Sequence, residues 1–173
     1  ISNTFQMKTK ISVLALITTF ALLSSCLKPE TFPVEPYIEF SSFTAMQDSG
    51  EIAITFTDGD GDIGLAAGDT TGSFKPGKLY HHNLFIEYYE KDDVAGWVRG
   101  KDLSGEDIEF LYRVPNLTPN GNNKALKGTI KVVIEPSYFN PISPESDTIK
   151  YIIKLVDRDL NESNIVESPV ITR

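Results

Sequence analysis

The sequence is poor in the side chains on which several classes of protein depend. A single cysteine, Cys26, excludes a disulfide scaffold and a thiolate zinc cluster. The two histidines, His81 and His82, are adjacent, so on a strand they would face opposite sides and could not share a metal ion. The sequence has no histidine pair at zinc-protease spacing and no Gly-x-Ser-x-Gly elbow. With no recognisable catalytic motif, we expect a protein that is not an enzyme.

Positive charge is also scarce. The chain has 16 basic and 24 acidic residues, which gives a formal net charge of −8. Because there is no basic surplus to neutralise phosphates, the composition argues against nucleic-acid binding. The apolar fraction of 40% is too high for a disordered chain, and 173 residues suit one domain with a small appendage.

The N-terminal segment has the pattern of a secretory signal. From Met7 a short basic stretch is followed by an apolar run over residues 11–23 and then by small residues. The run is too short for a membrane-spanning helix, which needs about 20 apolar residues. We therefore predict a leader over residues 1–25, of which residues 7–25 are the signal peptide and residues 1–6 lie upstream of the true start.

The end of this leader, Leu23-Ser24-Ser25-Cys26, resembles the lipobox of bacterial lipoproteins. The resemblance implies that Cys26 carries a covalent lipid and becomes the first residue of the mature chain, anchored stably when it holds two or more acyl chains. Residues 26–36 contain three prolines, which predicts an extended tether no longer than about 30 Å. Without residues 1–25, which hold two lysines and no acidic residue, the net charge becomes −10.

The remaining chain, residues 37–173, shows apolar side chains that alternate with period two, which is typical of β-strands. Clusters of glycine, proline, asparagine and aspartate separate the alternating runs. We expect strands at 37–40, 51–57, 83–90, 97–98, 108–114, 129–134, 149–156 and 166–172. The pattern predicts an all-β, immunoglobulin-like antiparallel β-sandwich of seven to eight strands, preceded by a cleaved signal peptide. The longest connection, residues 58–82, has a length that is usual for a functional or a disordered loop.

This connection begins with three aspartates at alternate positions, in Asp58-Gly59-Asp60-Gly61-Asp62. Calcium takes six to eight oxygen ligands, and glycines let the backbone curl around such an ion. The helical calcium loop has acids at positions 1, 3 and 5, glycine at 6 and glutamate at 12. Here position 6 is Ile63 and position 12 is Asp69, so the segment is more similar to the aspartate-rich calcium loops of extracellular β domains. The alternative is an acidic, solvated turn.

A second acidic cluster, with Asp157 and Asp159, follows the expected strand at 149–156. In an immunoglobulin-like strand order, this loop and the first aspartate loop lie at the same end of the sandwich, where the connection 116–124 should also open. We expect the two clusters to complete one site and Arg158 to pair with an acid there; the alternative is an isolated polar hairpin loop. The candidate calcium ligands are Asp58, Asp60, Asp62, Asp69, Asp157 and Asp159.

The mature chain also resembles a group of uncharacterised cell-envelope lipoproteins of Bacteroidota. The resemblance rests on the lipobox and on residues 56–64, 83–90, 123–128 and 157–164. It implies an envelope location and a β-sandwich but no activity. We therefore expect a calcium-stabilised protein, held at the outer membrane through the lipid on Cys26, that acts as a non-catalytic binding or assembly module. Its expected partners are the membrane and an envelope protein complex or a glycan.

Two other functions stay open at this point. Tyr80, Tyr88, Tyr89 and Trp97 offer aromatic faces for sugar rings, as in a glycan-binding accessory lipoprotein of a nutrient-uptake system, with Tyr89 and Trp97 as the candidate ligand-binding residues. The alternative is that half of these aromatic residues belong to the core. Paired carboxylates are also the residue type that a glycoside hydrolase uses.

Overall fold

The computed structural model describes residues 30–173, and it contains no α-helix in that range. In this part of the chain, no helical segment has the length and apolar character needed to cross a bilayer. The predicted signal peptide, the predicted lipidation site Cys26 and the first residues of the predicted tether lie outside the described residues. Residues 31–173 form one structural unit.

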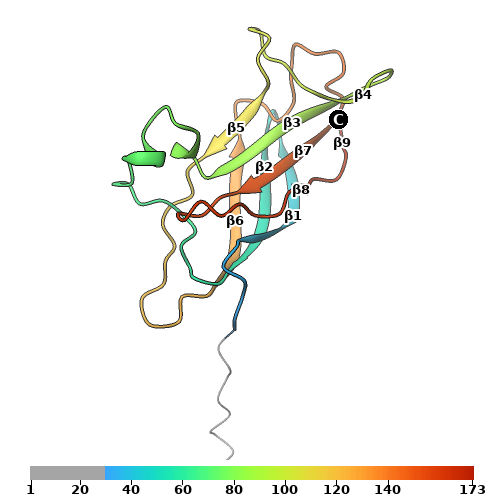
Figure 1. The fold of residues 1–173 in the computed structure, drawn as a ribbon. Helices are drawn as coiled ribbons and strands as arrows, with labels where there is room; N and C mark the ends of the chain where they lie inside the picture. Colours follow the sequence, from blue (N-terminus) through green and yellow to red (C-terminus); the bar gives the residue numbers. More distant parts are fainter. Residues whose placement is uncertain (1–29) are drawn as a thin grey trace, which may run out of the picture. The chain divides into compact units, whose positions relative to one another are not determined.

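Strands account for nearly all of the regular structure in this unit (Figure 1). The elements are β1 (Tyr37–Met46), β2 (Ser49–Asp58), η1 (Gly72–Phe74), η2 (Leu79–His81), β3 (Leu84–Asp92), β4 (Gly96–Arg99), β5 (Glu109–Tyr112), β6 (Leu126–Ile134), β7 (Thr148–Leu155), β8 (Val166–Glu167) and β9 (Ile171–Thr172). η1 and η2 are short 3-10 helices inside the long connection between β2 and β3.

The strands form two antiparallel sheets. The first sheet has the order β1-β2-β6, and the second has β3 and β7 at its centre. β4 and β5 pair with successive parts of β3, while β8 and β9 pair with successive parts of β7. This arrangement confirms the predicted all-β antiparallel sandwich. The strand count rises to nine because Ser168 and Pro169 interrupt the last expected strand, and proline has no N–H to donate to a ladder.

β1 is longer than the sequence predicts. Its pairing with β2 shifts register between Phe40 and Ser42, which marks a β-bulge. The bulge moves the inward face from even to odd positions, so Ile38 and Phe43 both reach the core. The alternation that identifies a strand is broken at this point, and the sequence pattern therefore ends too early.

The core lies between the two sheets, and two of its buried tyrosines are almost completely enclosed. Tyr88 and Tyr151 are each no more than 1% exposed, and their ring centroids are 5.9 Å apart. The backbone N–H of Asn140 donates to the Tyr88 hydroxyl oxygen at 3.0 Å, and the Tyr151 hydroxyl donates to the carbonyl of Tyr138. Burial raises the pKa of both tyrosines well above the usual value, so both stay protonated. Satisfied hydroxyls let these large side chains fill the core without an unpaired polar group.

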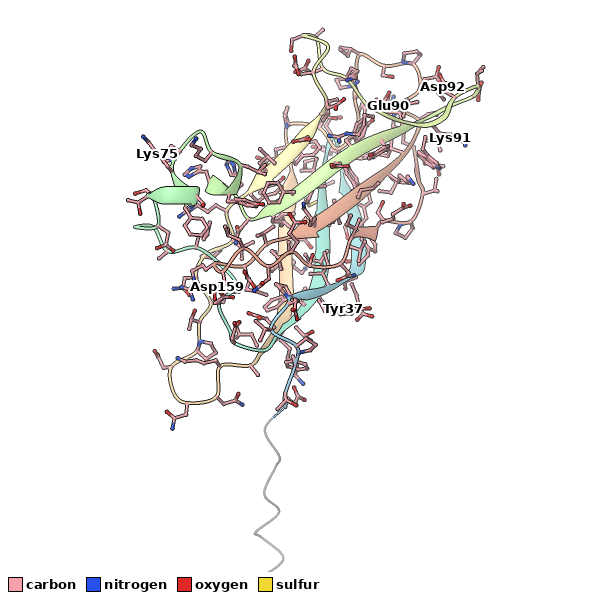
Figure 2. The ribbon with its side chains drawn as sticks, in the orientation of Figure 1. Tyr37, Lys75, Glu90, Lys91, Asp92 and Asp159 are labelled. Carbon is pink, nitrogen blue, oxygen red and sulfur yellow. The ribbon has the colours of Figure 1, made fainter. Side chains whose placement is uncertain are left out.

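The two ends of the sandwich carry different loops. β2 places Asp58 opposite Leu126 at one end and Gly50 opposite Ile134 at the other. The nine residues of strand from Gly50 to Asp58 separate these ends by about 27 Å. The N-terminal segment, the β2–β3 connection and the β7–β8 loop lie at the Asp58 end, which we call the aspartate end. Figure 2 shows Asp159 near this end and Glu90 near the other.

Candidate metal centre

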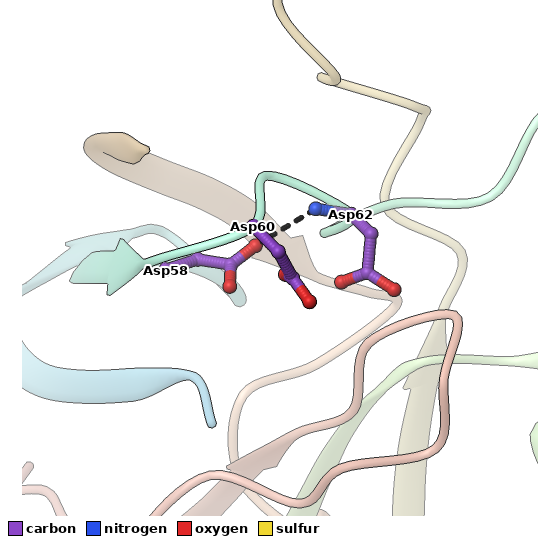
Figure 3. Close-up of side chains that lie close together, drawn as sticks. All are labelled: Asp58, Asp60 and Asp62. Atoms are coloured by element: carbon purple, nitrogen blue, oxygen red, sulfur yellow. Dashed lines mark hydrogen bonds between the residues drawn. The ribbon is translucent and has the colours of Figure 1, made fainter. Parts of the chain in front are cut away.

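Three aspartates converge where β2 ends (Figure 3). One carboxylate oxygen each from Asp58, Asp60 and Asp62 lies within 4.8 Å of the other two. Asp58 is fully buried on the inner face of β2, and the other two are half-buried. Gly61 has a φ of 71°, a left-handed conformation that costs glycine little. The chain can therefore reverse between Asp60 and Asp62 and bring their side chains together.

Each aspartate of this cluster has one buried oxygen without a hydrogen-bond donor. Within residues 30–173, Oδ1 of Asp58, of Asp60 and of Asp62 has no partner. The other oxygen of Asp58, Oδ2, accepts the backbone N–H groups of Asp62 at 3.0 Å and Ile63 at 3.2 Å. Thus one oxygen of Asp58 shapes the loop and the other is left unsatisfied. A buried carboxylate oxygen with no donor is costly, and a cation removes that cost. The three side chains can hold a metal ion.

The raised pKa values of the cluster also favour binding of a cation. Burial, followed by the charges of Asp157 and Asp60, raises the pKa of Asp62 from 3.8 to about 7. Burial also raises the pKa of Asp58 to about 6, with a further contribution from Asp60. The pKa of Asp157 is raised as well, first by burial. Without a cation, protons therefore compensate part of the negative charge of the cluster up to about neutral pH, and a bound cation would displace them.

In the presence of a chelator, the domain should lose stability as the pH rises from about 5 to about 8. The folded-state pKa values of Asp58 and Asp62 lie above their unfolded values, so the folded chain binds more protons. Their contribution to stability is complete below the unfolded pKa and disappears as the pH rises through about 6 to 7. Melting temperatures measured across this range test the prediction. A variant with both Asp58→Asn and Asp62→Asn should give a flatter profile; an equally steep profile contradicts the assignment.

The second acidic loop lies directly beside the first. The backbone N–H of Asp159 donates to Oδ2 of Asp62 at 3.0 Å, across 97 residues of sequence. The two loops therefore meet, as the strand order predicts. However, neither Asp157 nor Asp159 belongs to the group of three converging carboxylates. Asp159 is exposed and contributes its N–H, while Asp157 is buried.

Asn161, which was not among the predicted site residues, holds the Asp157 carboxylate. The backbone N–H of Asn161 donates to Oδ1 at 2.8 Å, and its side-chain amide donates to Oδ2 at 2.9 Å. Both oxygens of Asp157 therefore have donors, and they shape the β7–β8 loop. An aspartate followed by asparagine within one turn is the signal that could have indicated this closed loop.

Asp69, expected at position 12 of the calcium loop, lies apart from the converging cluster. Its carboxylate accepts the backbone N–H of Ala66 at 2.7 Å, and its carbonyl accepts the Arg113 guanidinium at 2.7 Å. Gly64, which has a φ of 91°, lies between the cluster and Asp69 in the chain. Asp69 instead closes a turn in the β2–β3 connection.

The connection between β5 and β6 lies against the same loop, as expected. A Cβ on Gly61 would be 2.0 Å from the carbonyl oxygen of Lys124, so the two backbones are in direct contact.

The expectation that Arg158 pairs with an acid is wrong within the described residues. Its guanidinium donates to the hydroxyl of Thr118, which this connection brings within reach, while the Asp157 carboxylate is held by its own loop.

The N-terminal segment also reaches the aspartate end. A Cβ on Gly59 would lie 2.3 Å from the carbonyl oxygen of Phe32, so only glycine allows this approach. The side chain of Asn164 then holds both backbone groups of Ile38: Oδ1 accepts its N–H at 2.8 Å and Nδ2 donates to its carbonyl at 2.9 Å. Both acidic loops are thus connected to the entry of the chain into the sandwich. No sequence pattern marked these contacts.

The candidate ligand-binding aromatics, Tyr89 and Trp97, carry cations over their rings. The ammonium nitrogen of Lys150 lies 4.9 Å from the Trp97 ring centroid and 5.9 Å from that of Tyr89. The guanidinium of Arg99 lies 5.6 Å from the Tyr89 centroid. A sugar ring would have to displace these cations in order to stack. Tyr88 belongs to the core, as the alternative interpretation anticipated for half of these residues.

Comparisons with family models, curated proteins and solved structures found no match to this chain. The resemblance to Bacteroidota envelope lipoproteins therefore stays a prediction that rests on the sequence motifs. Any function assigned to the chain must be argued from the geometry of the aspartate end.

Proposed function

We propose that the chain is a calcium-binding β-sandwich that acts as a non-catalytic binding or assembly module and is held at the outer membrane by a lipid on Cys26. The observation that carries the metal assignment is the set of three buried oxygens without a donor, one from each of Asp58, Asp60 and Asp62. An all-carboxylate ligand set suits a hard cation, whereas zinc and copper prefer nitrogen and sulfur. Support for the anchor and the location comes from the sequence alone.

A calcium ion at this cluster would stabilise more than one loop. Asp62 belongs to the β2–β3 connection and accepts a hydrogen bond from Asp159 of the β7–β8 loop. An ion that binds only the folded chain stabilises it by about 2.7 kcal/mol when its concentration is a hundredfold above the dissociation constant. The ion would therefore act as a structural element of the aspartate end, which suits a binding module more than a catalyst.

Calcium titration tests the metal part of this proposal. We expect the metal-stripped mature chain, with Cys26→Ser to prevent lipidation, to bind one calcium ion in a calorimetric titration. Asp62→Asn should abolish this binding because it removes an anionic ligand. Asp69→Asn is the matched control and should bind like the parent, since its carboxylate closes a separate turn.

Absence of binding by the parent chain, or equal weakening by both substitutions, would overturn the metal assignment. The anchor is tested separately, by labelling with radioactive palmitate cells that express the full precursor with Cys26 or with Cys26→Ser. Label should enter the chain that contains Cys26 and should be absent from the Cys26→Ser chain. Label in both chains, or in neither, contradicts the lipid assignment.

A further inference from the structure

An apolar pocket of about 510 Å³ lies at the end of the sandwich away from the aspartates. It opens between the β4–β5 connection and the β6–β7 connection, and Tyr88 contributes to its lining from β3. The walls that matter for its chemistry are Leu103, Ile108, Phe110, Phe139 and Ile142. A concave, mainly apolar volume of this size is typical of small-molecule sites.

The pocket lining contains one charged side chain, and one of its carboxylate oxygens is used within its own turn. Of the residues that line it within 30–173, Asp102 alone is charged. Its Oδ1 accepts three hydrogen bonds inside its own turn: from the N–H of Ser104 at 2.8 Å, from the Ser104 hydroxyl at 2.6 Å and from the N–H of Glu106 at 3.0 Å. Within the described residues the lining holds no cation to pair with an anionic ligand, whereas an uncharged apolar ligand would lose little hydration on binding.

The polar groups at the pocket tie its two connections together. Asn140, which is 6% exposed, donates its side-chain amide to the carbonyl of Lys101 at 2.8 Å and its backbone N–H to the Tyr88 hydroxyl at 3.0 Å. The Arg173 guanidinium lies 3.8 Å from the ring centroid of Phe139 and covers one face of this wall. These contacts hold the two connections together in the free chain, so that ligand binding costs little conformational entropy in the pocket walls.

Apolar side chains stand at the mouth of the pocket with most or half of their surface in water. Leu103 is 88% exposed and Ile142 is 52% exposed, one on each connection. Exposed apolar residues are common singly, but here both line the same apolar cavity. A molecule seated in the cavity would cover both.

We propose that this pocket is a binding site for an uncharged, predominantly apolar small molecule. The site is independent of the metal centre, which lies at the opposite end of β2. It gives the sandwich a ligand-binding function beyond the structural role of calcium.

N-phenyl-1-naphthylamine, an uncharged aromatic probe whose fluorescence rises in apolar surroundings, tests the site. We expect a saturable increase with one probe bound per mature chain carrying Cys26→Ser. Leu103→Asp and Ile142→Asp, which each place a charge at the mouth, should weaken probe binding by roughly tenfold or more. Both positions are exposed, so neither substitution removes a core side chain.

Val94→Asp is the matched control, since Val94 is 97% exposed and lies in the β3–β4 turn outside the pocket. It should bind the probe like the parent chain. Absence of saturable binding by the parent overturns the proposal. So does a Val94→Asp chain that loses as much affinity as Leu103→Asp, because that result means non-specific adsorption. Near-ultraviolet circular dichroism confirms that each variant keeps its packed aromatic core.

Discussion

Asp58→Asn should raise the stability of the metal-free chain and lower that of the calcium-loaded chain. Asparagine has the shape of aspartate, and its carbonyl can keep the hydrogen bonds from the N–H groups of Asp62 and Ile63. Its amide would then occupy the position of the unpartnered oxygen and face the carboxylates of the cluster as a donor. Near pH 8 we expect the metal-free variant to be more stable than the parent by about 1 to 2 kcal/mol, since the pKa of Asp58 is raised.

With calcium the sign reverses. The substitution removes an anionic ligand and places an amide where the ion would lie, so the stabilisation of about 2.7 kcal/mol expected at hundredfold excess disappears. Melting temperatures measured in calcium and in chelator should therefore reverse in order: the variant melts higher than the parent in chelator, and the parent melts higher than the variant in calcium. Asp159→Asn is the control, because its exposed side chain is not part of the cluster and only its N–H contacts Asp62. If Asp58→Asn lowers the stability by the same amount in calcium and in chelator, Asp58 has only a structural role and is not a calcium ligand.

Gly64→Ala should destabilise the chain by more than about 3 kcal/mol, the range of severe backbone effects. A Cβ at Gly64 would lie 1.9 Å from the carbonyl oxygen of Pro115 and 2.9 Å from Cα of Asn116. These are backbone atoms, and the N–H of Leu65 donates to the carbonyl of Val114 at 2.8 Å, which fixes the approach. Relief of the overlap therefore requires the two connections to separate.

Gly77→Ala separates the steric effect from the conformational one. Gly77 has a φ of 83°, close to the 91° of Gly64, but a Cβ at this position would have no atom within 4 Å outside its chain neighbours. Alanine there should cost only the left-handed conformation, about 1 kcal/mol. Urea denaturation followed by the fluorescence of Trp97 measures both variants. Equal losses of stability in Gly64→Ala and Gly77→Ala would mean that the close contact of Gly64 with Pro115 contributes nothing to the effect.

Local patterns in the sequence predicted the central strands β3 and β7 and the aspartate cluster, but they missed the second half of β1. β3 and β7 alternate cleanly, and Asp58, Asp60 and Asp62 are close in sequence, so their spacing predicts their meeting. Asp69 lies beyond Gly64, which has a positive φ, and a count of positions along the sequence does not include such a backbone conformation. Prediction therefore failed where a single backbone conformation decides which side chains meet.

The pocket could not be predicted for a different reason. Its lining comes from β3, from the β4–β5 connection and from the β6–β7 connection, which are far apart in the chain. Tyr88 and Ile108 have the appearance of ordinary core residues on alternating strands. Only the packing of the two connections through Asn140 leaves a volume between them.

The contacts at the entry of the chain determine how the domain would bear mechanical force. A pull on the N-terminal segment would be transmitted first to the backbone contact between Phe32 and Gly59 and then to the two hydrogen bonds between Asn164 and Ile38. Beyond Ile38, β1 runs antiparallel to β2 away from the aspartate end, so the load acts along the ladder. Its hydrogen bonds are then sheared together instead of opening one after another. The aspartate end is thus both the candidate ion site and the point where tension would enter the sandwich.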